Sequence, residues 1–136
     1  MSPARSGQNP EQFLNYPGSA LVVALLADKW TIPVIHALAR GTKRTGELRR
    51  ALAGISQKML TQTLRALEER SLVERTVFRV VPPRVEYQLT PLGRSLNEPL
   101  QTLCDWLKEN GRDLERRAAR SVRPRQARLL NQARVR

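Results

Sequence analysis

The sequence is poor in the residues on which most enzyme and metal sites depend. It contains one cysteine, Cys104, and one histidine, His36, among 136 residues. A single cysteine excludes a disulfide framework within the chain. His36 lies in an apolar segment, and no Ser-His-Asp set, metal-ligand cluster or phosphate-binding glycine loop accompanies it. Because nucleophilic catalysis needs a positioned base and a group that orients it, we expect no catalytic residue, no metal and no cofactor.

Two further absences bear on location and partner. The chain has no run of 18 apolar residues, so no transmembrane helix is expected, and its first 19 residues lack the apolar core of a signal peptide. Together with the lone cysteine, this pattern predicts a cytoplasmic protein with no membrane partner. Aromatic residues make up only 4% of the chain. Proteins that bind single-stranded RNA stack bases on aromatic side chains, so this scarcity disfavours that function.

Positive charge is abundant and unevenly spread. Lysine and arginine total 24 against 12 acidic residues, which gives a net charge of +12. Residues 112–136 contain nine arginines against Asp113 and Glu115, a net of +7, which leaves +5 for residues 1–111. Such a balance favours a polyanionic partner. Two alternatives stay open, a merely soluble basic surface and a basic protein that binds nucleic acid without sequence preference.

The chain divides into three parts by composition. Residues 1–18 are polar with three prolines and predict a mobile arm, or a segment ordered against a partner subunit. Residues 19–111 form the predicted domain, and residues 112–136 an arginine-rich tail that is helical to about Arg120 and disordered beyond. Within the domain, helices are expected at 19–27, 30–39, 47–52, from Ser56 to Arg70, and from Pro91 onward, with Thr90 as the cap of the last.

The segment from Gly54 to Thr90 is the most informative. Leucines recur in its first half at the spacing of one buried helix face, and two strand-like runs, 73–78 and 84–89, follow on either side of Pro82-Pro83. A polar, cationic helix followed by a basic hairpin is a shape that reads duplex DNA. The predicted fold class is therefore mainly α with a small β-hairpin wing (α+β), a winged helix-turn-helix.

Only the N-terminal end of a recognition helix reaches the floor of the major groove, so base contacts are expected there. Glutamine suits adenine, lysine suits guanine, and the threonine methyl can touch thymine. Arginines and lysines in the hairpin and before the third helix are expected to meet phosphate. A solvated helix face and ordinary loop solubility are the competing readings. The predicted DNA contacts are Lys43, Arg44, Ser56, Gln57, Lys58, Thr61, Gln62, Arg65, Arg79 and Arg84. A cross-strand pair is expected between Arg75 and Glu86.

Several motifs together resemble one family. They are Asp28-Lys29-Trp30-Thr31, Gly46-Glu47-Leu48-Arg49-Arg50, Gly54-Ile55-Ser56-Gln57-Lys58-Met59-Leu60-Thr61, Val81-Pro82-Pro83-Arg84-Val85-Glu86-Tyr87 and Leu89-Thr90-Pro91-Leu92-Gly93. Over roughly residues 17 to 110 the chain resembles the HxlR-type branch of the winged helix-turn-helix regulators, within the MarR-like superfamily. The resemblance implies a homodimeric bacterial or archaeal transcription factor, here a repressor, that binds double-stranded DNA at a palindromic operator. A small-molecule effector would be of unknown identity.

The resemblance also implies a dimer interface made by the first helix and the long helix after the hairpin. The residues expected there are Leu21, Leu25, Leu96, Leu100, Leu103, Cys104 and Leu107. Two departures stand out. Tyr16 replaces a cysteine that serves many members as a redox-sensing thiol, and Ser71 stands where a helix-ending glycine is common. Cys104 is then either a redox sensor or a small buried hydrophobe, and the missing second cysteine favours the latter.

Overall fold

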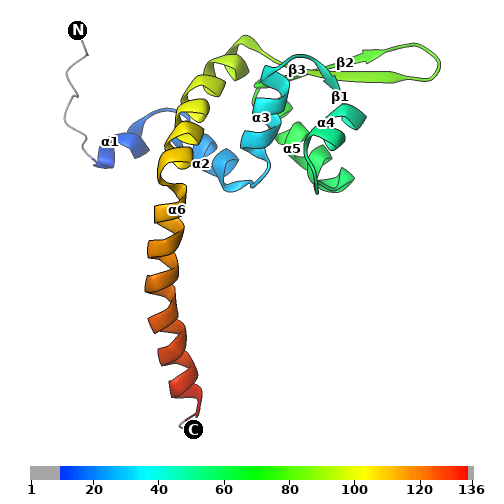
Figure 1. Cartoon of the computed structure of the whole chain (residues 1–136). Coiled ribbons are helices and arrows are strands. Elements are labelled where there is room, and N and C mark those ends of the chain that lie inside the picture. Colours follow the sequence, from blue (N-terminus) through cyan, green and yellow to red (C-terminus); the bar gives the residue numbers. More distant parts are fainter. Residues whose placement is uncertain (1–9, 135–136) are drawn as a thin grey trace. The chain divides into compact units, whose positions relative to one another are not determined.

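The computed structural model describes the backbone of residues 10–134 and the side chains of residues 11–121 (Figure 1). The chain separates into two units, Met1–Asn97 and Glu98–Arg136, which are considered individually. The elements, in order, are α1 (Pro10–Asn15), α2 (Ser19–Ala27), α3 (Thr31–Ala39), β1 (Lys43–Arg44), α4 (Thr45–Ala51), α5 (Gln57–Glu69), β2 (Val73–Phe78), β3 (Arg84–Leu89) and α6 (Pro91–Arg134).

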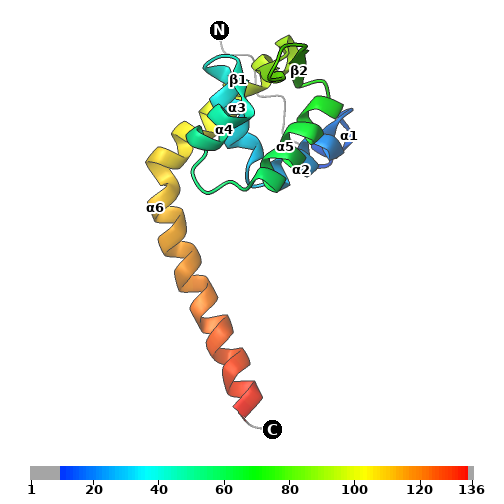
Figure 2. The same ribbon diagram turned by 90° about the vertical axis from the view of Figure 1, so that its right-hand side faces the viewer.

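Three helices, α3, α4 and α5, pack against one another and form the core of the first unit (Figure 2). Each helix contributes aliphatic side chains spaced three or four residues apart, so that one face is buried. Leu60 and Leu67 of α5 are fully buried and Leu64 nearly so, which confirms the leucine face expected from the sequence. The fully buried side chains that complete this core are Val34, Ile35, Leu38 and Leu48.

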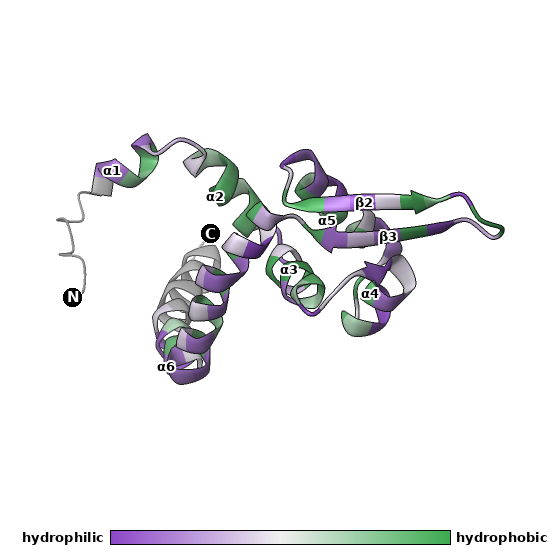
Figure 3. Cartoon of the chain, turned by 90° about the horizontal axis from the view of Figure 1, so that it is seen from above, coloured by the Kyte–Doolittle hydropathy of each residue, from purple (hydrophilic) through white to green (hydrophobic). Residues whose placement is uncertain are grey.

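An antiparallel sheet of three strands, in the order β1-β3-β2, covers one end of these helices. β2 and β3 form the hairpin, with Val73 opposite Leu89 and Phe78 opposite Arg84, and they run out together as a wing (Figure 3). Both strands begin and end at the residues expected from the sequence. β1 was not expected, because a two-residue strand shows no periodicity and depends on pairing with β3.

Asp28 ties the start of α3 to the middle of α5. One oxygen of its carboxylate accepts the backbone N–H of Trp30 at 2.9 Å, and the other accepts the Thr63 hydroxyl at 2.9 Å. Thr63 is only 1% exposed, so its hydroxyl needs a partner inside the protein. The bond joins residues 35 positions apart and fixes α5 against α3.

The start of α6 is held against the end of α5 by a second set of polar contacts. The Thr90 hydroxyl donates to the Ser71 carbonyl at 2.6 Å and accepts the Gly93 N–H at 3.1 Å, so Thr90 caps the helix as expected. Ser71 has a φ of 58°, in the left-handed region that favours glycine. The sequence departure at this position is therefore a real backbone cost.

At both ends of the chain the structure has more helix than expected. Residues 10–15, expected in a mobile arm or in a segment ordered against a partner subunit, form α1, which starts with a proline and carries Glu11 in its first turn, both favourable there. Residues 1–9 lie outside the described part. The helix expected to end near Arg120 continues to Arg134. Residues 125–134 are mostly arginine, glutamine, alanine and leucine, strong helix formers whose combined propensity outweighs Pro124.

Candidate nucleic-acid interface

The exposed face of α5 carries the side chains predicted to contact bases. Every one of Gln57, Lys58, Thr61, Gln62 and Arg65 is exposed, whereas the opposite face of the same helix is buried in the core. The helix is therefore anchored on one side and offers amide, hydroxyl and cationic groups on the other. These are the groups that recognise base edges in the major groove and phosphates beside it.

Two of these side chains are already oriented in the absence of DNA. The Gln57 side-chain amide donates to the Thr61 hydroxyl at 3.3 Å, one helical turn further along. One amide proton and the amide oxygen of Gln57 are left for an adenine, which offers N7 as acceptor and N6 as donor. Thr61 thus supports Gln57 from the side, a role in addition to the expected methyl contact with thymine.

Ser56 caps α5, and this leaves its hydroxyl proton for a contact with DNA. Its hydroxyl oxygen accepts the backbone N–H of Met59 at 3.1 Å, as the N-cap of α5. The hydroxyl proton remains a donor, which suits a phosphate oxygen more than a donor–acceptor pair on a base.

The wing arginines Arg79 and Arg84 differ in a way that the sequence did not indicate. Arg79 is exposed in the connection between the strands, beside Val80 and Val81. Arg84 instead lies over the Phe78 ring, 4.3 Å from its centroid, and its Nε lies 3.4 Å from a Glu86 carboxylate oxygen. The guanidinium of Arg84 is thus engaged within the wing, whereas Arg79 is exposed in the connection between its strands.

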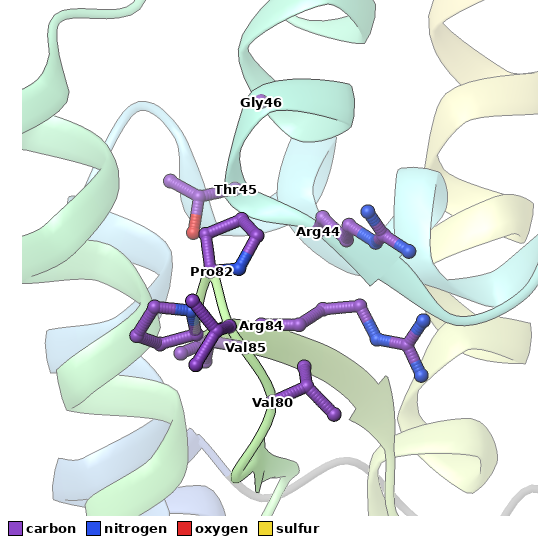
Figure 4. Close-up of a pocket in the computed structure, with 9 residues that line it drawn as sticks. Arg44, Thr45, Gly46, Val80, Pro82, Arg84 and Val85 are labelled. Carbon is purple, nitrogen blue, oxygen red and sulfur yellow. The ribbon is translucent and has the colours of Figure 1, made fainter.

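A hollow of about 480 Å³ lies between the wing connection and the start of α4 (Figure 4). The Arg44 and Arg84 side chains extend to the same side of it, and Pro82 lies close to Thr45. Arg44, with Lys43, belongs to β1 rather than to the loop expected at this place. Arg44 is exposed and its backbone N–H donates to the Glu47 carboxylate at 3.2 Å, which closes the first turn of α4.

The expected pair between Arg75 and Glu86 is wrong. The strand register places Arg75 opposite Tyr87 and Glu86 opposite Thr76. Arg75 lies instead 3.5 Å from Glu68 of α5, and Glu86 pairs with Arg84. A one-residue offset in a strand turns a side chain to the opposite face, so pairing could not be predicted without the register.

The residues predicted for a dimer interface differ in how much surface they offer. Leu21 on α2, and Leu103 and Leu107 on α6, are 53%, 41% and 46% exposed. Leu25 and Leu100 are buried in the single chain, so these two side chains add little area for a partner. Leu96 and Cys104 are half-buried. Further exposed apolar side chains, beyond the seven residues predicted for the interface, are Phe13, Leu14, Val23, Leu26, Trp106 and Leu114.

The hydrogen bond between Asp28 and Thr63 was not predicted from the sequence. Both lie in or near motifs that were quoted, but a hydrogen bond between positions 35 residues apart leaves no local signal. Among the side chains described, those of residues 11–121, no group of three or more His, Cys, Asp or Glu is placed to hold a metal ion. No single described helix is long and apolar enough to cross a membrane, and α2 and α3 meet that criterion only as a pair bent by 94°.

Comparison with known proteins agrees with this geometry. Residues 25–115 match the family model described as HxlR-like helix-turn-helix. The uncharacterized HTH-type transcriptional regulator YtfH of Escherichia coli (strain K12) is 43% identical over 89 residues, covering 65% of this chain and 71% of YtfH. The uncharacterized HTH-type transcriptional regulator YkvN of Bacillus subtilis (strain 168) is 47% identical over 89 residues, covering 65% of this chain and 75% of YkvN.

Solved structures of transcriptional regulators also align with this chain. The redox regulator HypR in its reduced form aligns with a TM-score of 0.66 at 36% identity, over 71% of this chain and 95% of HypR. The reduced transcriptional regulator YodB from B. subtilis aligns with a TM-score of 0.62 at 35% identity, over 69% of this chain and 92% of YodB. All four proteins are named as regulators rather than as enzymes. With its winged helix-turn-helix fold and its match over residues 25–115, this chain belongs to the HxlR-like helix-turn-helix family of transcriptional regulators.

Proposed function

We propose that the protein is a homodimeric repressor that binds a palindromic operator in double-stranded DNA, in the cytoplasm. The observation that carries this proposal is the two-sided character of α5. Its buried leucines fix it in the core, and its exposed face presents Gln57, Lys58, Thr61 and Gln62. In this proposal these four side chains read bases, and Lys43, Arg44, Arg65 and Arg79 contact phosphates.

Exposed apolar side chains support the dimer. Leu21, Val23 and Leu26 on α2 are 53%, 53% and 42% exposed, and α6 presents Leu103, Trp106 and Leu107. Apolar side chains that the single chain leaves exposed are stabilised when a second copy covers them. A two-fold dimer would place its two α5 helices about 34 Å apart, one turn of DNA, which matches a palindrome. A dimer seated on the operator would exclude other proteins from it, which is why we propose repression.

The alternative is nucleic-acid binding without sequence preference, which the net charge of +12 supports. One competition experiment separates the two. A labelled operator fragment, found by footprinting the protein on its own genome, is challenged with a shuffled duplex and with single-stranded RNA of equal charge.

A sequence-specific repressor should prefer the operator over both competitors by about 10³-fold or more at physiological salt. Equal competition by all three nucleic acids would leave the nonspecific alternative. Sedimentation at micromolar concentration should show a dimer, and a purely monomeric protein would contradict that part of the proposal.

A further inference from the structure

A small polar hollow separates the middle of α5 from the sheet. Thr61, Leu64, Arg65 and Glu68 line it from α5, and Arg75 of β2 and Tyr87 of β3 line it from the sheet, around a volume of about 200 Å³. None of the lining residues other than Thr61 and Arg65 belongs to the DNA contacts proposed above. The hollow is therefore an additional feature, placed between the two elements that the proposed function assigns to DNA.

The charges in the hollow favour an anion. Its charged lining residues are Arg65, Arg75 and Glu68, whose formal charges sum to +1. Arg75 Nε lies 3.5 Å from Glu68 Oε1, with the two side chains 48% and 40% exposed. Charge-assisted hydrogen bonds are usually about 2.7–2.9 Å long, so this contact is loose. A half-exposed ion pair of this length contributes little, and a stronger anion can displace Glu68 from Arg75.

Tyr87 adds a neutral donor to these cations. Burial raises the pKa of Tyr87 above 10.0; the nearby Arg75 opposes this effect and Glu68 adds to it. The hydroxyl therefore keeps its proton at physiological pH and can donate to an oxygen anion. Thr61 brings a second hydroxyl to the same hollow.

We propose that this hollow seats one backbone phosphate of duplex DNA, with Arg75 as its main ligand and Glu68 as an internal competitor for Arg75. The inference rests on the proposed function, because it needs DNA to lie along α5 and the wing. In the free protein Glu68 holds Arg75 at the hollow. When DNA binds, a phosphate replaces the Glu68 carboxylate on Arg75, and Arg65 and the Tyr87 hydroxyl complete the seat.

Because Glu68 competes with the phosphate for Arg75, loss of the Glu68 carboxylate should increase the affinity for DNA. Binding of the full-length protein to the operator and to a shuffled duplex is measured across a salt series. Glu68→Gln should raise affinity for both duplexes roughly threefold to tenfold, because Arg75 is released to the phosphate. Glu69→Gln is the matched control, since Glu69 is the next residue of α5, carries the same charge and does not line the hollow.

A double-mutant cycle then tests whether Glu68 acts through Arg75. Arg75→Gln should lower affinity for both duplexes roughly tenfold per bound protomer and reduce the salt slope by about one. In the Arg75→Gln background, Glu68→Gln should have no further effect beyond that of the Glu69→Gln control. Tyr87→Phe should cause a smaller loss with little change in slope, since it removes a neutral donor. Thermal unfolding of every variant confirms that it is folded.

Two outcomes would overturn the phosphate seat while leaving the proposed function intact. One is an equal gain from Glu68→Gln and Glu69→Gln, which would mean a general charge effect. The other is a gain from Glu68→Gln that persists undiminished without Arg75. If the parent protein binds the operator and the shuffled duplex equally, the proposed sequence-specific function fails, and the Glu68 and Arg75 variants still test the phosphate seat on either duplex.

Discussion

Replacing Gly93 with alanine should destabilise the protein, because no space exists there for a side chain. Gly93 lies in the first turn of α6, where an added Cβ would overlap the Leu72 carbonyl oxygen and lie 3.0 Å from its carbon and 3.2 Å from Leu89 Cδ2. The obstacle is backbone, which cannot rotate away as a flexible side chain can. The same carbonyl oxygen accepts the Thr90 N–H at 3.1 Å, so moving it also strains that hydrogen bond.

The expected magnitude follows from these contacts. Overpacking at a close contact costs about 1–3 kcal/mol, and the weakened hydrogen bond adds about 1 kcal/mol. Alanine is the better helix former by about 1 kcal/mol, which offsets part of the loss. The net destabilisation is therefore about 1–3 kcal/mol. At roughly 4 °C per kcal/mol for a chain of this length, Tm should fall by about 4–12 °C.

The same helix supplies the control. Gly111 also lies in α6 and has nothing within 4 Å of a built Cβ, so Gly111→Ala tests the helix propensity alone. It should raise Tm by a few degrees, in keeping with a gain of up to about 1 kcal/mol. Both variants are compared with the parent by calorimetry at two protein concentrations, so that any dimer contribution is separated. A Gly93→Ala variant at least as stable as the parent would refute the packing argument.

Three further predictions concern DNA reading, backbone strain and redox response. Gln57→Ala should weaken operator binding by about 1–3 kcal/mol per half-site and leave binding to a shuffled duplex nearly unchanged. Arg79→Ala should weaken binding to both duplexes and flatten its salt dependence. If gel-shift titrations show the same loss on both duplexes for Gln57→Ala, that result would contradict base reading. Ser71→Gly should raise the free energy of unfolding by about 0.5–1 kcal/mol, because glycine adopts a positive φ without steric cost. The larger backbone entropy that glycine loses on folding offsets part of this gain. An unchanged free energy of unfolding in urea would argue against backbone strain at Ser71. Cys104→Ser should bind the operator as the parent protein does, and the oxidant diamide should barely change operator binding by the parent. If diamide releases the operator from the parent protein but not from Cys104→Ser, Cys104 is a redox sensor.

The sequence predicted the elements well where a periodic pattern was long enough. The leucine spacing of α5, the two strands of the hairpin and the Thr90 cap all appear where the pattern placed them. Failures occurred where the determinant was not local. β1 forms because β3 pairs with it, and the partner of Arg75 depends on a strand register that periodicity does not fix.

The chemistry of the site was harder to predict than its position, because residue type does not reveal what a side chain is already bound to. Three groups counted from the sequence as available for DNA or for a cross-strand pair have other partners in the fold. Ser56 caps α5, Arg84 lies between Phe78 and Glu86, and Arg75 is next to Glu68. Each of these contacts must be kept or exchanged when DNA binds, and an exchange lowers the net gain from a phosphate contact.

The count of 24 lysines and arginines therefore overstates the positive charge available to DNA, while the exposed side chains of α5 remain available for bases. A chain that uses part of its positive charge on its own carboxylates binds random duplex more weakly than its number of cations suggests. Because phosphate contacts enter operator and random binding alike, the ratio between the two depends on the base contacts of α5. Internal carboxylates such as Glu68 and Glu86 would then lower affinity for every duplex and leave the preference for the operator to the base contacts of α5.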